Sequence, residues 1–298
     1  MNNHRNTLAR HSSGDEQAES VRKRSVRTTV LPMAPTLRGT HRYSPNRRGR
    51  LGEALLLGII ILLVSLSPAR ADCNAAPAPG VNWLGCDKSG AQLQGVNLDR
   101  ALLSRTQFDE ADLSRTSLRG ADFGSARLRE TNLDGANLQR TRFVAANMVG
   151  VSLRDADAVG VRLDRAQMQG AILSGADLSG GRLYATNLRD ADLSGASLRG
   201  ADLTQAELGG ADLRQANLSG ISARRASLED ADLRETDLSD ADLQGARLAG
   251  ADFTGADLRG ADLRQADITG TRFEQAELSS AIWTDRRRCG RGSVGVCR

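Results

Sequence analysis

A five-residue period runs through most of this 298-residue chain and constrains its fold more than any other feature. Of the 39 residues between Leu93 and Trp283 whose numbers end in 3 or 8, 28 are Leu and five are Phe. The residues two places earlier are mostly small, with 27 Ala and seven Thr. No insertion or deletion breaks the phase, so a single five-residue unit repeats throughout this segment.

This period fits neither an α-helix nor an extended strand. Residues i and i+5 lie about 500° apart around a helix, which would spread the leucines over every face. A strand would send alternate leucines to opposite faces of a sheet. Each repeat must therefore be a short straight piece and a corner, with Leu inside, Ala near the corner and Gly at the turn. Four such sides close a square coil, and stacked coils pair at about 4.8 Å.

The repeat follows the pattern Ala-Asp-Leu-x-x, as in Ala201-Asp202-Leu203-Thr204-Gln205 and Ala261-Asp262-Leu263-Arg264-Gln265. This pattern resembles the pentapeptide-repeat superfamily. The resemblance implies an all-β fold, a right-handed quadrilateral parallel β-helix, and parallel β connections favour the same hand. The repeats from Val81 to Asp285 would form about ten coils, counted at four repeats a coil.

Composition divides the chain into five parts. We expect a disordered Arg-rich segment over 1–50, a signal-peptide apolar region with its cleavage site over 51–71, an N-terminal cap with the first irregular repeats over 72–90, the β-helix over 91–285, and a C-terminal disulfide cap over 286–298.

The segment before the repeats has the order of a secretory signal. Basic residues at Asn46–Arg50 precede the apolar run Ala54–Leu66, and Ala69-Arg70-Ala71 places small residues before a cut. We therefore expect cleavage after Ala71 and a periplasmic or secreted protein. The alternative is an inner-membrane anchor, although a span needs about 20 apolar residues. The sequence leaves open the Sec or twin-arginine route and a start at Met1 or Met33.

The four cysteines, Cys73, Cys86, Cys289 and Cys297, flank the repeats in two pairs. Export to an oxidising compartment favours disulfides. Pairing within each end, Cys73 with Cys86 and Cys289 with Cys297, is favoured among the three possible arrangements. Zinc is the competing interpretation, but each end offers two cysteines and no histidine.

The formal charge is +7 over 1–90, −8 over 91–285 and +5 over 286–298. A pI near 9.2 therefore does not describe the repeats, and we expect no nucleic-acid partner. No histidine follows His41, and no phosphate loop, nucleophile elbow or metal motif is present. These features predict a protein that is not an enzyme and has no cofactor and no metal site.

Candidate binding residues lie just before the repeated leucines. Asp192, Asp212, Asp232 and Asp252, twenty residues apart, form what we call the aspartate column. We expect these side chains to accept backbone N–H groups at turns; the alternative is an acidic strip for a basic partner or divalent cations.

The arginine column consists of Arg142, Arg162 and Arg182. It departs from the repeat's preference for Asp or Asn, which makes it the better candidate contact site for an acidic glycan, a phosphate group or a partner protein. The alternative is a solvated ladder interleaved with Asp155, Asp157 and Asp164.

These observations favour an exported non-enzymatic scaffold or protein-interaction module. Its partner would be an unknown protein or envelope component, with a homodimer possible and membrane contact only through the export signal. The resemblance implies an alternative, a cytoplasmic DNA mimic that binds a DNA topoisomerase. A third candidate is a polysaccharide-active or glycan-binding β-helix.

The columns also make internal predictions. Phe123 should stack on Phe143 and Phe253 on Phe273, because each pair is 20 residues apart. Trp83 and Trp283 should close the two ends of the apolar interior. Ala158 replaces a Leu, so we expect a local distortion of the coil there, and the tail over 286–298 should cap the last coil's edge.

Overall fold

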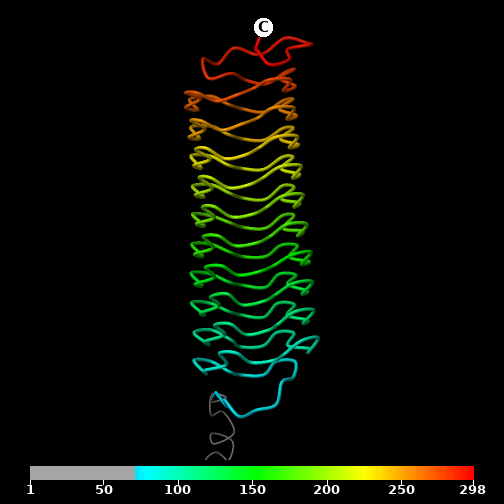
Figure 1. Ribbon diagram of the computed structural model, residues 1–298, viewed down its shortest axis with the longest axis vertical. Helices are drawn as coiled ribbons and strands as arrows, with labels where there is room; N and C mark the ends of the chain where they lie inside the picture. Colours follow the sequence, from blue (N-terminus) through cyan, green and yellow to red (C-terminus); the bar gives the residue numbers. More distant parts are fainter. Residues whose placement is uncertain (1–70) are drawn as a thin grey trace, which may run out of the picture. The chain divides into compact units, whose positions relative to one another are not determined.

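The computed structural model describes residues 71–298. The expected disordered segment over 1–50 and the signal region preceding Ala71 lie outside the described residues. Within 71–298 the chain winds as a stack of regular coils, with the earliest described residues at one end and the C-terminus at the other (Figure 1).

Parallel backbone bridges between residues 20 apart join the coils. One column of ten such bridges runs from Asn82↔Leu102 to Asp262↔Ile282, and three more columns run beside it. Residues 71–298 contain no α-helix and no strand longer than a single bridge. The chain thus forms a parallel β-helix whose coils are joined by isolated bridges. The expected all-β fold would suggest extended strands, but each straight piece between corners is only about three residues long.

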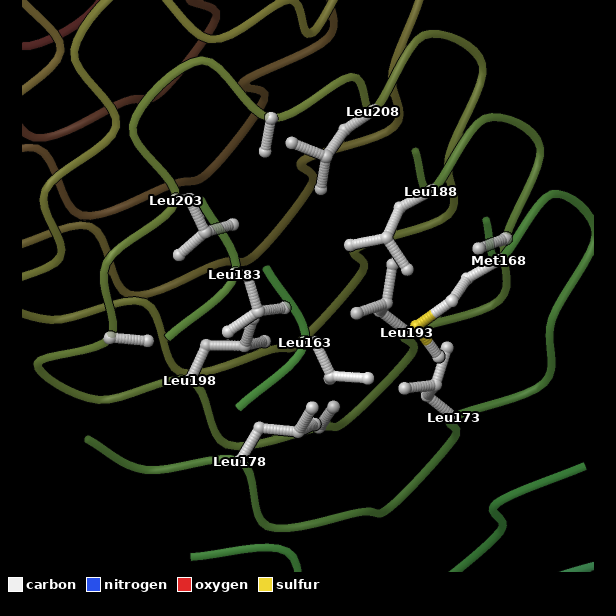
Figure 2. Packing of buried hydrophobic residues seen from close by; sticks show 14 of the residues in the cluster. Leu163, Met168, Leu173, Leu178, Leu183, Leu188, Leu193, Leu198, Leu203 and Leu208 are labelled. Carbon is white, nitrogen blue, oxygen red and sulfur yellow. The ribbon is translucent and has the colours of Figure 1, made fainter. Parts of the chain in front are cut away.

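The repeated leucines fill the interior, as the period predicted. Figure 2 shows side chains from successive repeats meeting inside the coil, among them Leu183, Leu188 and Leu203. Leu203 is 1% exposed, and the small residue Ala201 beside the corner is equally buried. Burial of a Leu side chain contributes about 1.5–3 kcal/mol, so the column of leucines is the main source of stability.

Every corner has a left-handed backbone. Each fifth residue from Gly80 to Ser280 has a positive φ, and many of these residues are not glycine; Arg140 (φ 55°) is one example. A side chain at such a position costs about 1–2 kcal/mol relative to glycine. The coil closes only through these corners, so interior packing overrides the local preference.

Large side chains stack in neighbouring coils as predicted. The ring centroids of Phe123 and Phe143 lie 4.8 Å apart, and those of Phe253 and Phe273 lie 5.3 Å apart. Trp83 is 1% exposed at one end of the core. At the other end, Trp283 is only partly buried and packs 5.3 Å from Phe273, measured between ring centroids.

Threonines at the small interior position are bonded to the previous coil. The Thr141 hydroxyl donates to the Leu118 carbonyl at 2.7 Å, and Thr186 donates to Leu163 at 2.7 Å. A buried hydroxyl without such a partner would be costly. This bond explains why Thr, although polar, can replace Ala there.

The predicted distortion at Ala158 is wrong. Asp157 keeps its bridge to Asp177, and the Ala158 N–H donates to the Asp177 carbonyl at 2.8 Å. The missing side chain instead leaves a small apolar cavity of about 10 Å³ next to Phe143, Met148 and Leu178. The backbone bridges on both sides hold the coil in place, so the gap is not closed by collapse.

Filling this gap should stabilise the protein. We expect Ala158→Val to raise the free energy of unfolding by about 1 kcal/mol, since each added buried methyl group contributes about 0.8 kcal/mol before repacking costs. Chemical denaturation measures this change. Ala206→Val is the matched control at a fully buried small position, and an equal gain in both variants would contradict a cavity specific to Ala158.

Both predicted disulfides are confirmed. Cys73 bonds to Cys86 and Cys289 to Cys297, with Cα atoms 5.4 and 4.8 Å apart. Lys88, which breaks the apolar pattern, donates to the Cys73 carbonyl at 2.7 Å and lies 4.2 Å from the centroid of the Trp83 ring. Each disulfide ties a cap to one end of the coil.

Candidate functional site

The arginine column lies on one side of the coil. Backbone bridges join Arg142 to Arg162 and Arg162 to Arg182, so the three residues occupy successive coils. Their side chains are 49–55% exposed. The structure brings together the three arginines that the sequence singled out and presents them to solvent.

A buried carboxylate lies between two of these arginines. The Asp164 side chain is only 9% exposed, and its Oδ1 is 2.6 Å from Arg182 Nε while Oδ2 is 3.6 Å from Arg162 Nε. Although the first distance is short, neither oxygen receives a well-directed hydrogen bond. The contacts are therefore electrostatic, and one negative charge lies between two positive ones.

The direction of these contacts leaves donors free. Asp164 faces the Nε edge of both guanidinium groups. An Arg side chain has five N–H donors, and the four on its Nη atoms form the outer edge that binds carboxylates and phosphates in a fork. Arg162 and Arg182 thus present their Nη groups without an ion-pair partner in the described part of the chain.

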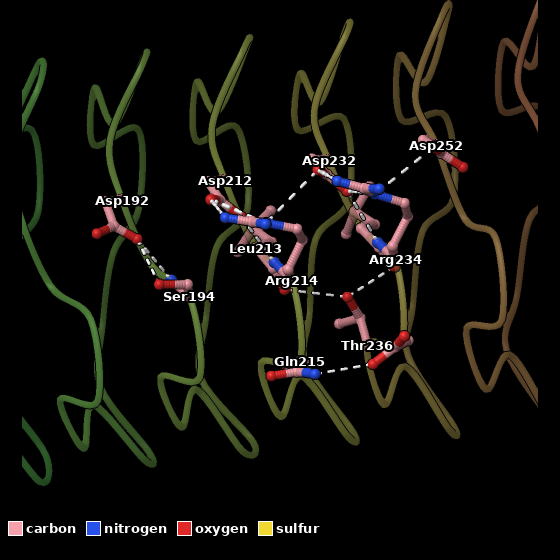
Figure 3. Close-up of polar contacts among 12 residues, drawn as sticks. Asp192, Ser194, Asp212, Leu213, Arg214, Gln215, Asp232, Arg234, Thr236 and Asp252 are labelled. Carbon is pink, nitrogen blue, oxygen red and sulfur yellow. Dashed lines mark hydrogen bonds and ion pairs between the residues drawn. The ribbon is translucent and has the colours of Figure 1, made fainter.

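The aspartate column is built differently (Figure 3). As predicted, these side chains accept the backbone N–H two residues later, at 3.0 Å from Ser194 to Asp192 and 3.1 Å from Arg214 to Asp212. Arg214 also binds both oxygens of Asp212 through Nε and Nη2. These carboxylates are turn caps, and the charge of Asp212 is paired with that of Arg214.

Arginines continue along this column. Arg234 pairs with Asp232 at 2.6 Å and reaches Asp252 at 3.9 Å, and Arg272 also contacts Asp252. Three of the four aspartates are therefore in contact with arginine. The aspartate column does not form an acidic strip open to a basic partner or to divalent cations. Among residues 71–298 no group of three or more His, Cys, Asp or Glu side chains could hold a metal ion.

Residue order decides between the two arrangements. In Asp212-Leu213-Arg214 the Asp precedes Leu, and the Arg two residues later folds back on it in a fork; Asp262-Leu263-Arg264 does the same. Arg162-Leu163-Asp164 has the reverse order, so the Asp lies at the turn and the Arg on the bridge column. This reversed order is visible in the sequence and is the signal that distinguishes Asp164 from the other acids near the arginine column.

Of the three acids expected beside the arginine column, only Asp164 contacts it. Asp157 instead accepts a hydrogen bond from Gln139 at 2.7 Å, and Asp155 lies at a corner with a positive φ. Asp122, which we did not predict, pairs with Arg142 at 3.3 Å through Nη1. Arg142 therefore has less of its guanidinium free than Arg162 and Arg182.

The repeat signature and the coil together decide the family. The family model for pentapeptide repeats matches over 86–124, 121–157, 146–183, 182–220, 219–260 and 246–282. The chain belongs to the pentapeptide-repeat family. Membership in that family implies a right-handed quadrilateral β-helix.

Several solved pentapeptide-repeat structures are similar to this one. HetL, involved in heterocyst differentiation regulation in the cyanobacterium Nostoc sp. strain PCC 7120, is 32% identical over 78% of this chain and 98% of its own, with a TM-score of 0.39. A protein of the Arabidopsis thaliana thylakoid lumen is 36% identical over 33% of this chain and 68% of its own, with a TM-score of 0.21. QnrB1, a plasmid-mediated fluoroquinolone resistance protein, is 23% identical over 51% and 80%, with a TM-score of 0.30. No curated protein matches this chain.

The Asp–Arg forks make stability depend on pH. The pKa values of Asp212, Asp257 and Asp262 are lowered, chiefly by hydrogen bonds from the arginine two residues later. Because each folded-state pKa lies below the unfolded value of about 3.9, the forks stabilise the fold above that pH. This stabilisation is lost as pH falls through the folded-state pKa values.

We therefore expect the melting temperature to fall as the pH drops below about 4, because these carboxylates then take up protons. Asp257→Asn with Asp262→Asn keeps an acceptor for each turn but removes the titrating charge, and should flatten this dependence. Calorimetry across the range measures both, and an unchanged slope in the double variant would show that other groups control it.

Proposed function

We propose that this pentapeptide-repeat protein is an exported, non-enzymatic binding module whose arginine column contacts an acidic surface of a protein partner. The observation that carries the proposal is the pair Arg162 and Arg182, whose Nε atoms lie nearest to one buried carboxylate while their side chains are about half exposed to solvent. Pentapeptide-repeat proteins are generally non-enzymatic scaffolds, in keeping with this role.

The location outside the cytoplasm rests on the expected signal before Asp72 and on the two disulfides. Disulfides persist in oxidising compartments such as the periplasm. No helix within the described residues is long and apolar enough to cross a membrane. In this proposal the coil has about ten turns and is right-handed, which is the hand that parallel β connections favour.

The DNA-mimic alternative ranks lower for a structural reason. A surface that replaces DNA needs a continuous run of negative charge, whereas Asp212, Asp232 and Asp252 are each in contact with arginine. Fluoroquinolone resistance, the property named for QnrB1, is therefore not proposed for this chain.

Affinity capture from the envelope fraction tests the contact surface. The baits are the wild type, Arg162→Ser/Asp164→Ser/Arg182→Ser, and the control Arg100→Ser/Arg140→Ser, whose arginines form no ion pair within residues 71–298. The triple variant removes both arginines and the buried carboxylate together, since an unpaired buried charge would destabilise the coil. Serine occupies the same columns at Ser222 and Ser104.

We expect to capture a protein that binds to the wild-type bait and to the control bait but not to the triple variant. The circular dichroism spectra of the three baits should be the same. Equal retention by every bait would refute the arginine column as the contact surface. Cell fractionation with N-terminal sequencing tests export: the proposal predicts a mature chain that starts at Asp72 outside the cytoplasm, and an intact cytoplasmic chain would reverse the ranking in favour of the DNA mimic.

A further inference from the structure

The tail over 286–298 forms the last layer of the column. It turns back on the final coil through antiparallel bridges, Ile282↔Arg288 and Glu277↔Val294. Its backbone also satisfies that coil's edge, since the Leu278 N–H donates to the Ser293 carbonyl at 2.8 Å. The capping role expected from the sequence is confirmed by these bonds.

The solvent-exposed residues of this cap include both cationic and apolar side chains. Arg286, Arg288, Arg291 and Arg298 form no ion pair within the described part of the chain; Arg287 alone pairs, with Asp285 at 3.3 Å. Val294 and Val296 are 43% and 49% exposed, and they are two of only five large apolar residues so exposed in 71–298. The backbone of the tail makes the bonds that cover the last coil, so the side chains of the free arginines and the exposed valines are not used by those bonds.

Charge is also segregated along the axis. The tail carries +5, whereas the coils over 201–285 that lie next to it carry −9. A negatively charged membrane would attract the end and repel the walls, so the charge distribution favours an end-on orientation. Arginines with short apolar side chains between them are suited to the headgroup region of a bilayer.

We propose that the tail docks end-on against anionic phospholipid headgroups, with its free arginines on the phosphates and Val294 and Val296 inserted between them. This surface lies outside the arginine column, so it acts independently of the proposed protein contact. The protein would stand on the membrane with the arginine column displaced along the axis from the lipid surface.

Probe residues at opposite ends of the coil test the orientation. Val296→Trp places an indole on the tail, and Leu84→Trp is the matched probe at a site 48% exposed near the other end. Each full-length variant is mixed with vesicles of phosphatidylcholine that contain about one-third phosphatidylglycerol, with brominated chains as quenchers, since anionic lipid supplies the attraction. We expect quenching above the wild type for Val296→Trp only, and none with pure phosphatidylcholine.

Charge removal supplies the second measurement. Arg286→Ser/Arg288→Ser/Arg291→Ser should lower binding to the anionic vesicles at least tenfold, whereas Arg100→Ser/Arg105→Ser/Arg140→Ser should leave it unchanged. High salt should weaken the wild type in the same direction. Quenching of Leu84→Trp alone, or equal binding by both charge variants, would overturn the proposal by showing attachment through another part of the chain.

Discussion

Replacing Leu203 with lysine is expected to abolish the cooperative folding of the coils around it. The Leu203 side chain is 1% exposed inside the stack, and its backbone is paired with the next coil through Ser222. Loss of a buried Leu costs about 2–5 kcal/mol, and a buried ammonium group without a partner adds more. The total approaches the whole stability of a typical domain, about 5–15 kcal/mol.

Circular dichroism during thermal denaturation measures this effect. Gln205→Lys is the control, because Gln205 lies two residues away and is exposed. It should change the free energy of unfolding by no more than about 0.5 kcal/mol. A repeat protein is held together by contacts between neighbouring units, so the lysine should also loosen adjacent coils. A wild-type melting curve for Leu203→Lys would contradict the inward position of the leucines.

Loss of the Cys289–Cys297 disulfide should have the second largest effect on stability. The bond closes a loop with a sequence separation of 8 residues, and removal of a native disulfide from a small domain typically costs about 2–5 kcal/mol. Cys289 and Cys297 are 2% and 4% exposed, so the bond also belongs to the packed end of the core. Without it the tail would separate more readily from the last coil and expose an unpaired backbone edge.

We therefore expect Cys289→Ser/Cys297→Ser to unfold at lower denaturant concentration and to associate as protein concentration rises. Light scattering with denaturation reports both effects. Cys73→Ser/Cys86→Ser is the comparison at the other end, where Lys88 and the Trp83 indole, which donates to the Ala75 carbonyl at 3.2 Å, give the cap additional contacts. Association without concentration dependence, or equal to that of the wild type, would argue against the tail as an edge cap.

The interior could be predicted from the sequence because its volume fixes the residue type. A position that faces inward in every coil accepts Leu, Phe or Met and excludes charge, which is why the stacking of Phe123 on Phe143 followed from their spacing alone. The response to Ala158 could not be predicted in the same way. Whether a missing side chain distorts a coil or leaves a cavity depends on the backbone bonds on either side, and these hold the coil.

The surface was less predictable because its contacts join different coils. Ion pairs such as Arg119 with Asp99 connect residues 20 apart, and Arg224 with Asp242 connects residues 18 apart. Which pair forms depends on side-chain direction at the corner as well as on register. The arginine column was found from its departure from the repeat, but the buried position of Asp164 required coordinates.

Nuclear magnetic resonance of the arginine side chains tests the central claim most directly, that Asp164 holds the Nε edges of Arg162 and Arg182 and leaves their Nη groups free. We predict that Asp164→Asn shifts the Nε resonances of these two residues more than their Nη resonances, because the carboxylate lies nearest to Nε. Arg214, whose Nε and Nη2 both bind Asp212, should be unaffected by that change. Equal shifts of the Nε and Nη resonances at Arg162 and Arg182, or no response to Asp164→Asn, would contradict the account.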